Sequence, residues 1–432
     1  MRTGCRSTVL RLWCVWLVAC AAGCYQSYGD GDGGADAPPT VPPTACAEIR
    51  ADLVVPRDYS TIQQAVNAAS AGSVVCVEPG TYVENVQIED RPAFRLVGVA
   101  GPAATIIDGD ARWTVVSFTL MSDPGMVIEG FTLRNGWQDS PRGGAMDIQA
   151  SSVTLRHLVV VDSSSNWSPV GGIRISGSSA TLTDVVVARN IGYHVAAPGG
   201  LLIQAESDVT AENIVVAANV ANRDHGPLRA GGIELGDGAT LRLTNAIVAG
   251  NTGGIRAGEG SSSVLRNVVV TGNEDFGLRV EGGSVELSNV SLTFNGGIGL
   301  ESLRGTVTGR YCNAFGNATG DVSGPVASWD DGTNLSADPL YLSTSGESPL
   351  AWDLHLAPDS PLVGAGDPAV LDPDRNRSDI GAWGGPGAGD WDLDGDGYRS
   401  WWQPGAYDGT DYPPLGLDCN DADRSVRPGS GC

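Results

Sequence analysis

The chain has 432 residues, of which 41% are hydrophobic and 60 are glycine. This length suffices for two ordinary domains or one long repeat domain, and the glycine content favours many turns over long helices. The formal net charge is −24, from 50 acidic and 26 basic residues, and every basic residue is an arginine. Such acidity argues against a nucleic-acid partner and suits cation binding.

The N-terminus has the pattern of an export signal. Three arginines precede an apolar run at residues 12–22, which is too short to span a bilayer stably. Cys20 and Cys24 each follow small residues and resemble the lipidated cysteine of bacterial lipoproteins. We prefer Cys24, because it leaves the longer apolar run, and we expect residues 1–24 to be the signal peptide. Cleavage without a lipid is the alternative.

These features predict a lipoprotein of the bacterial outer membrane or cell surface, with a secreted protein as the alternative. The membrane contact is expected through the lipid alone, and the protein is expected to be a monomer. Residues 25–45 are rich in glycine, aspartate and proline, which cannot build a core, so we predict a disordered linker there.

The next segment predicts a short amphipathic helix at residues 59–70. Ser60 and Gln63 have the spacing of a capping box, and a strip of apolar residues follows one face of the helix. Such a helix would cover the edge of the first coil of a repeat structure. The strip consists of Ile62, Ala65, Val66 and Ala69.

Internal repeats dominate the middle of the chain. Nine-residue segments such as 243–251, 265–273 and 287–295 align without gaps, and copies recur every 22 to 32 residues between 128 and 295. Each segment holds a short run of β-branched residues, and most segments end at an asparagine. After most of the segments come one or two glycines followed by Ile or Leu. A unit this short cannot bury an apolar face alone, so the units must stack strand on strand. We therefore expect Asn251, Asn273 and Asn295 to form a ladder of amides at one corner of the stack.

The opening residues 74–86 and the closing segments 356–367 and 378–384 resemble those of the pectate-lyase-like superfamily. The resemblance covers about residues 50–387. It implies an all-β, right-handed parallel β-helix at residues 46–387 with an N-terminal capping helix. It implies no particular activity, because the catalytic sequences of the family's enzymes, such as Arg-x-Pro-x-x-Arg, have no match here. A lysine base is excluded, since the chain has no lysine.

The cysteines beyond the signal peptide agree with export. Cys46 with Cys76, and Cys419 with Cys432, are plausible disulfides by proximity, which would leave Cys312 without a partner.

Four inserts between the asparagine corner and the Gly-Gly signature predict a wall of loops on one face. They lie at residues 136–142, 163–170, 191–198 and 220–230. Aromatic rings beside arginines suit sugar binding, although the loops could simply pack on each other. The candidate ligand-binding residues are Trp137, Asp139, Arg142, Trp167, Tyr193, His194 and Arg229. The weak catalytic candidates are Asp224, His225 and Arg223, as an acid, a base and a cation for a uronate.

The function expected from these features is binding of a polysaccharide or another extracellular ligand. The alternative is a polysaccharide lyase or glycoside hydrolase acting on an acidic polysaccharide.

Residues 388–432 form an Asp-rich tail. Aspartates at alternate positions followed by glycine aim several carboxylates at one hard cation, which predicts calcium; a solvated acidic tail is the alternative. The run resembles a metal-binding motif of exported myxobacterial-type proteins. The predicted ligands are Asp390, Asp392, Asp394, Asp396, Asp418, Asn420, Asp421 and Asp423.

Overall fold

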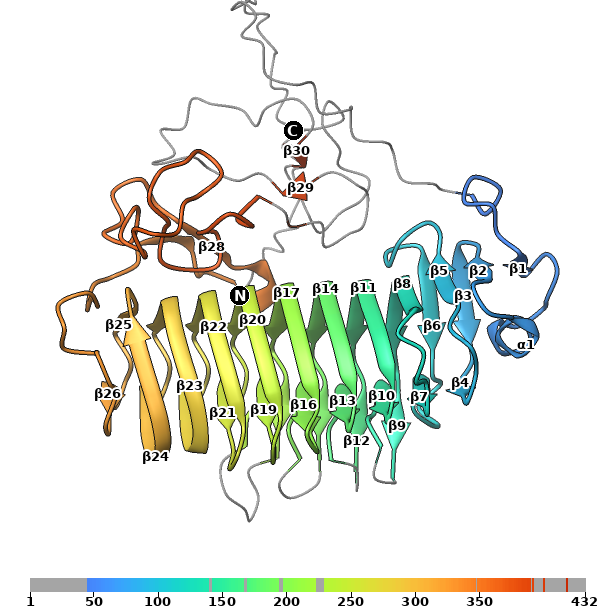
Figure 1. The fold of residues 1–432 in the computed structure, drawn as a ribbon, viewed down its shortest axis with the longest axis horizontal. Helices are drawn as coiled ribbons and strands as arrows, with labels where there is room; N and C mark the ends of the chain where they lie inside the picture. The colour runs from blue at the N-terminus through green and yellow to red at the C-terminus, as the bar shows by residue number, and fades with distance from the viewer. Residues whose placement is uncertain are drawn as a thin grey trace, which may run out of the picture. The chain divides into compact units, whose positions relative to one another are not determined.

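The computed structural model describes residues 45–139, 142–166, 169–193, 197–222, 229–346, 348–389 and 391, and the backbone of 399–400 and 417–418. All of these belong to one compact unit, Pro39–Cys432. Within it, parallel strands from successive coils stack side by side along the axis of a β-helix (Figure 1). The predicted all-β solenoid is therefore confirmed.

Each coil has three faces. In the coil that begins after Asn251, the short strand β21 (Ile255–Ala257) forms face 1, and the long strand β22 (Ser262–Thr271) forms faces 2 and 3. The long strand bends at Asn267, whose φ of 51° is a left-handed conformation that asparagine tolerates. Side chains alternate between the core and the outer surface along every face.

The remaining strands repeat this plan. Face 1 comprises β4 (Val86–Glu89), β7 (Val116–Thr119), β10 (Met146–Gln149), β13 (Ile173–Ser176), β16 (Leu201–Gln204), β19 (Ile233–Leu235), β21, the first residues of β23 (Leu278–Thr293) and β24 (Ile298–Arg310), and β26 (Gly320–Ser323). Faces 2 and 3 comprise β1 (Leu53–Val55), β2 (Val74–Val77), β3 (Gly80–Val83), β5 (Arg95–Gly98), β6 (Thr105–Asp108), β8 (Met126–Arg134), β11 (Ser152–Val161), β14 (Ser179–Ala188), β17 (Asp208–Ala217), β20 (Thr240–Ala249), β22, the later parts of β23 and β24, and β25 (Asn313–Phe315).

The predicted asparagine ladder is present and longer than expected. Six buried side chains stack in it, and each Nδ2 donates to the Oδ1 of the next at 2.8–3.1 Å. Each Nδ2 also donates to a strand carbonyl, as Asn273 does to Val248 O at 3.1 Å. The ladder thus satisfies the polar groups of the tight corner without water. Its members are Asn190, Asn219, Asn251, Asn273, Asn295 and Asn317.

The N-terminal end is closed by helix α1 (Ile62–Ala68), which packs on β1, β2 and β4 as predicted. Its N-cap is Thr61, which accepts a hydrogen bond from Gln64 N, so the predicted capping pair is wrong by one residue. Glu84 from the next coil reaches the helix and accepts from the backbone N–H groups of residues 62 and 63 at 2.8 and 3.0 Å. The first turn is therefore capped both by the local Thr61 and by a carboxylate from another coil.

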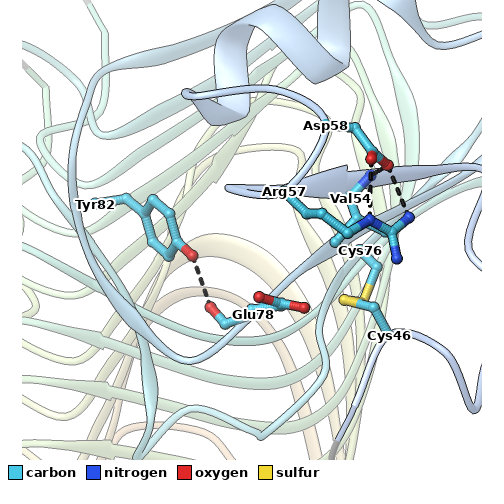
Figure 2. Close-up of a disulfide and its surroundings, with 7 residues drawn as sticks. All are labelled: Cys46, Val54, Arg57, Asp58, Cys76, Glu78 and Tyr82. Carbon is cyan, nitrogen blue, oxygen red and sulfur yellow. Dashed lines mark hydrogen bonds and ion pairs between the residues drawn. A yellow bond between two sulfur atoms is a disulfide. The ribbon is translucent and has the colours of Figure 1, made fainter.

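A disulfide joins Cys46 to Cys76 in β2, confirming the predicted pair (Figure 2). It ties the segment before the first strand to the first coil, beside the ion pair of Arg57 and Asp58. Cys312 is a free, buried thiol, and its pKa is raised to about 12 by burial. Cys419 and Cys432 lie outside the described residues.

After Leu335 the chain stops adding coils and folds back as a cap, which we define as residues 338–391. The cap holds an antiparallel pair, β27 (Tyr341–Ser343) with β28 (Asp353–Leu356), and a 3₁₀ turn η1 (Pro349–Ala351). The predicted β-helix range thus contains coils followed by this docked segment. Beyond it, β29 (Arg399–Ser400) pairs in parallel with β30 (Leu417–Asp418).

Among the described residues, no helix combines the length and apolarity needed to cross a membrane.

Candidate functional site

The four inserts begin as a small sheet of their own. The short strands β9 (Trp137–Gln138), β12 (Ser164–Ser165), β15 (Ile191–Gly192) and β18 (Val220–Ala221) stack in parallel between the ladder corner and face 1. The inserts therefore emerge in register from one corner of the coils, as predicted. This places the loop wall along one edge of face 1.

Beside this wall, a row of charged side chains occupies the outer surface of face 1. They are the outward members of the short strands, whose flanking residues, such as Ile173 and Ile175 around Arg174, point into the core. Successive members are register partners, so they lie one rung apart, about 4.8 Å. The row, here called the charged row, runs Ser117, Asp147, Arg174, Leu202, Glu234, Arg256, Arg279 and Glu301.

Ion pairs connect the row from coil to coil. Arg174 Nε donates to Asp147 at 2.6 Å, and Arg279 Nε donates to Glu301 at 2.6 Å. Asp147 is fully buried and Arg174 is 7% exposed, so this pair is closed off from solvent. Charges this deeply buried need partners with good geometry, which the register of the coils provides.

Glu234 is the centre of the densest cluster. It is 2% exposed and accepts from Arg256 at 3.0 Å and from Arg229, which reaches it from the fourth insert. Burial raises the pKa of Glu234, although the two guanidinium groups oppose that effect. Arg256 also pairs with Glu281. Burial disfavours its cation, but hydrogen bonds to Glu281 and Glu234 leave the pKa of Arg256 above its usual value.

An open hollow of about 580 Å³ lies over this cluster, and we call it hollow 1. It is lined by face 1, including Leu202, Glu234 and Arg256, and by residues that follow face 1 in their coils, such as Asp237, Glu259 and Arg304. The insert residues Pro169, Pro198 and Arg229 complete the lining. Three arginines face four carboxylates in its lining, the latter being Glu234, Asp237, Glu259 and Glu281. Such paired donors and acceptors suit neutral polar groups better than a single strong anion.

A second hollow, hollow 2, lies at the start of the row and has a volume of about 360 Å³. Trp113, which is 60% exposed, lines it together with Arg142 and Ser117. Gln87, Thr114 and Gln138 complete the lining. Among these described residues one arginine and no carboxylate is present, so hollow 2 is the local exception to the acidity of the chain.

The structure distributes the predicted ligand-binding residues unevenly. Arg229 lies in hollow 1 and Arg142 in hollow 2. Trp137 and Tyr193 lie with their ring centroids 6.1 Å apart. Asp139 is exposed on the first insert. Trp167, His194 and the catalytic candidates Arg223, Asp224 and His225 lie outside the described residues.

The charged row itself was not predicted. A signal for it exists, because charged residues directly follow several Gly-Gly-Ile or Gly-Leu signatures, as at Arg174, Glu234 and Arg256. Trp113 and the other carboxylates of hollow 1, Asp237, Glu259 and Glu281, carried no comparable pattern.

The predicted calcium ligands also fall outside the described residues, except that the backbone of Asp418 belongs to β30. In the part of the chain that is described, no three His, Cys, Asp or Glu side chains gather in a way that could hold a metal ion.

Comparison with known proteins supports the fold. A family model described as right handed beta helix region matches residues 120–337. The crystal structure of pectate lyase Pel9A aligns with a TM-score of 0.53 at 15% identity, over 76% of this chain and 94% of that one. The pectin methylesterase of Aspergillus niger aligns with a TM-score of 0.31 at 12% identity, over 61% of this chain and 88% of that one. No curated protein matches the sequence. The likeness to Pel9A, at 15% identity, bears on the fold alone.

Proposed function

Because the chain belongs to the right-handed β-helix family, we propose that it binds a polysaccharide over the charged row of face 1 without chemically changing it. The observation that carries the proposal is the chain of linked Arg–Glu pairs lining hollow 1, beside a wall of inserts, with Glu234 buried and its partners half-buried. Charges fixed by their neighbours in this way present donors and acceptors at set positions on an open surface.

Sugars are suited to such a surface. Each hydroxyl both donates and accepts, so it can bond to an arginine and a carboxylate at the same time. Glu234, Arg256 and Glu281 offer that alternation from adjacent rungs. The shared ion pairs also hold these side chains in place before a ligand arrives, which lowers the entropy cost of binding.

Hollow 2 adds a preference for an acidic sugar. Trp113 offers an exposed aromatic surface for a sugar ring, and Arg142 is the one charged group in the described lining. A carboxylate on the ligand would meet that cation without a competing protein carboxylate. Ser117 starts the charged row and Glu234 lies four rungs further on, so the two hollows are roughly 19 Å apart. That separation favours an extended ligand over a single sugar.

Binding, rather than turnover, is favoured by the state of the charged groups that line hollow 1. Arg256 is held as a cation by its carboxylates, which is the opposite of what a general base requires. Glu234 is enclosed by Arg229 and Arg256, and its role is to fix their positions.

The test is affinity electrophoresis through gels that contain polygalacturonate, its fully methyl-esterified form, or a neutral glucan. We expect the protein to be retarded most by polygalacturonate. Arg304→Ala in hollow 1 should weaken retardation by every polysaccharide that binds, and Arg142→Gln in hollow 2 should reduce affinity for the free acid by about tenfold, equivalent to about 1.4 kcal/mol, and spare the ester.

The matched control is Arg266→Ala. Arg266 follows Arg256 in the same coil but lies on face 2, where its pair with Glu286 is exposed. Unchanged mobility of all variants in every gel would refute the proposal. Release of unsaturated products or new reducing ends from any of these polysaccharides would replace it with the lyase or hydrolase alternative.

We further propose, from the sequence, that the protein is exported, anchored by lipid at Cys24, and binds calcium through its tail. The Cys46–Cys76 disulfide supports export, because disulfides persist in oxidising compartments. Cys24→Ser should move the protein from the membrane fraction to the soluble fraction. Equilibrium dialysis against calcium should show bound ion that is lost when Asp392 and Asp394 are replaced by Asn.

A further inference from the structure

The cap crosses the coils along the bend between faces 2 and 3, in the direction opposite to the coils. Its backbone is held by the side-chain amides of three asparagines that occupy this bend in consecutive coils and are not part of the ladder. Asn289 accepts from Asp367 N at 2.7 Å, and Asn267 Nδ2 donates to Asp379 O at 3.1 Å. Asn245 Nδ2 then donates to the carbonyls of residues 382 and 384 at 2.7 and 2.8 Å. These bonds carry the chain from the coil of Asn289 back to the coil of Asn245.

Next to this bend, face 3 presents an apolar stripe. Its outward residues are register partners in five consecutive coils: Val159, Val186, Val215, Ile247 and Val269. The cap covers the last two, leaving Ile247 9% and Val269 1% exposed. Val159 and Val186 are only half-buried, although they continue the same surface.

The edge of the covered area coincides with the end of the cap. Trp391 is 2% exposed, packs against Trp383 at 5.8 Å between ring centroids, and belongs to the cluster that covers Ile247 and Val269. Val215 touches that cluster at its border. The chain therefore arrives at the uncovered part of the stripe with residues 392–432 still to follow.

We propose that the chain's own residues 401–417 cover Val186 and Val159, extending the cap along face 3. This stretch carries Trp401, Trp402 and Tyr407, the kind of side chains that cover a valine surface. The reach is sufficient, because the ten residues after Trp391 span up to about 33 Å when extended and Val159 lies two rungs from Val215, roughly 10 Å. The extended cap is an intramolecular docking surface on a face separate from the charged row.

The test measures maleimide labelling of a cysteine placed on the stripe of the full-length protein, quantified on the peptide that contains it. Val186→Cys should label at least tenfold faster when Trp401→Ser and Trp402→Ser are also present. Thr181→Cys, an exposed position on face 2 of the same strand, is the matched control and should label equally fast with either tail. Val159→Cys gives an independent second site in the preceding coil.

The proposal is supported if the two tryptophan replacements speed the labelling of Val186→Cys or Val159→Cys by a factor that does not depend on protein concentration. Equal labelling rates with and without the two tryptophans would overturn it. Slow labelling that disappears on dilution would also overturn it, since a second copy of the chain would then be the occupant. Neither result bears on polysaccharide binding, which is tested on face 1.

Discussion

Replacing Asn273 by alanine tests the ladder at its centre. The Asn273 Oδ1 accepts from the backbone N–H and from the Nδ2 of Asn251, both at 3.0 Å. Its Nδ2 donates to Val248 O at 3.1 Å and to Asn295 Oδ1 at 2.9 Å. Asn295 Oδ1 keeps a second donor, the backbone N–H of residue 273, so three buried groups lose a partner.

Each buried polar group left without a partner costs about 1–3 kcal/mol, and partial relaxation of the corner reduces the sum. We therefore expect Asn273→Ala to lower the free energy of unfolding by roughly 3–5 kcal/mol. The assay is guanidinium denaturation followed by far-ultraviolet circular dichroism. Asn376→Ala, at an exposed turn of the cap, is the control and should cost less than about 0.5 kcal/mol.

Asn273→Asp sharpens the comparison. Aspartate keeps both acceptor contacts with Asn251 but turns a carboxylate oxygen toward the oxygens of Val248 and Asn295. We expect its loss of stability to grow as pH rises and the buried carboxylate ionises. A loss below about 1 kcal/mol for Asn273→Ala would refute the reasoning that the amide ladder stabilises the coils.

Three further predictions concern the cap and the cysteines. Burial and the neighbouring Asp379 carboxylate raise the pKa of Asp372 to about 7, and burial raises that of Asp379 to about 6. Both folded pKa values exceed the unfolded value near 3.8, so the folded state holds protons more tightly and stability falls as pH rises from about 4 to 7. Asp379→Asn should therefore flatten this decline in pH-dependent denaturation and stabilise the protein at pH 8; an unchanged slope would contradict the assignment. Reducing the Cys46–Cys76 disulfide, which spans a sequence separation of 30, should lower the unfolding free energy by about 2–4 kcal/mol in denaturant titrations, and an unshifted midpoint would contradict this. Cys312, with its pKa raised to about 12 by burial, should react with iodoacetamide only after denaturation; rapid labelling of the native protein would contradict its burial.

The coil architecture was predictable from the repeat, because an asparagine recurs at the same corner of successive coils. Asn251, Asn273 and Asn295 are 22 residues apart, and their stacking follows once the strands are paired in register. The apolar strip of the capping helix was predictable for a similar reason, since its period is local. The N-terminal N–H groups of that helix are also bound by Glu84, which comes from the following coil and leaves no local trace in the sequence.

The site was less predictable, because its charges become neighbours only through the register. Glu234 and Arg256 occupy single outward positions in three-residue strands, and coils of different length separate the members of the row. Arg229 was identified as a wall residue, but its pairing with Glu234 depends on how the fourth insert returns to face 1. The docking of the cap could not be predicted either, because its contacts join residues far apart in the sequence, such as Asn289 and Ser378, which are 89 residues apart.

Amide hydrogen exchange with and without bound polygalacturonate tests the central claim most directly. We predict that the ligand slows exchange in residues 229–237 and 256–259, around the short strands under hollow 1, and leaves the exposed side of face 2 in β14 and β17 unchanged. Protection confined to face 2 or face 3, with none at hollow 1, would contradict a binding site on the charged row.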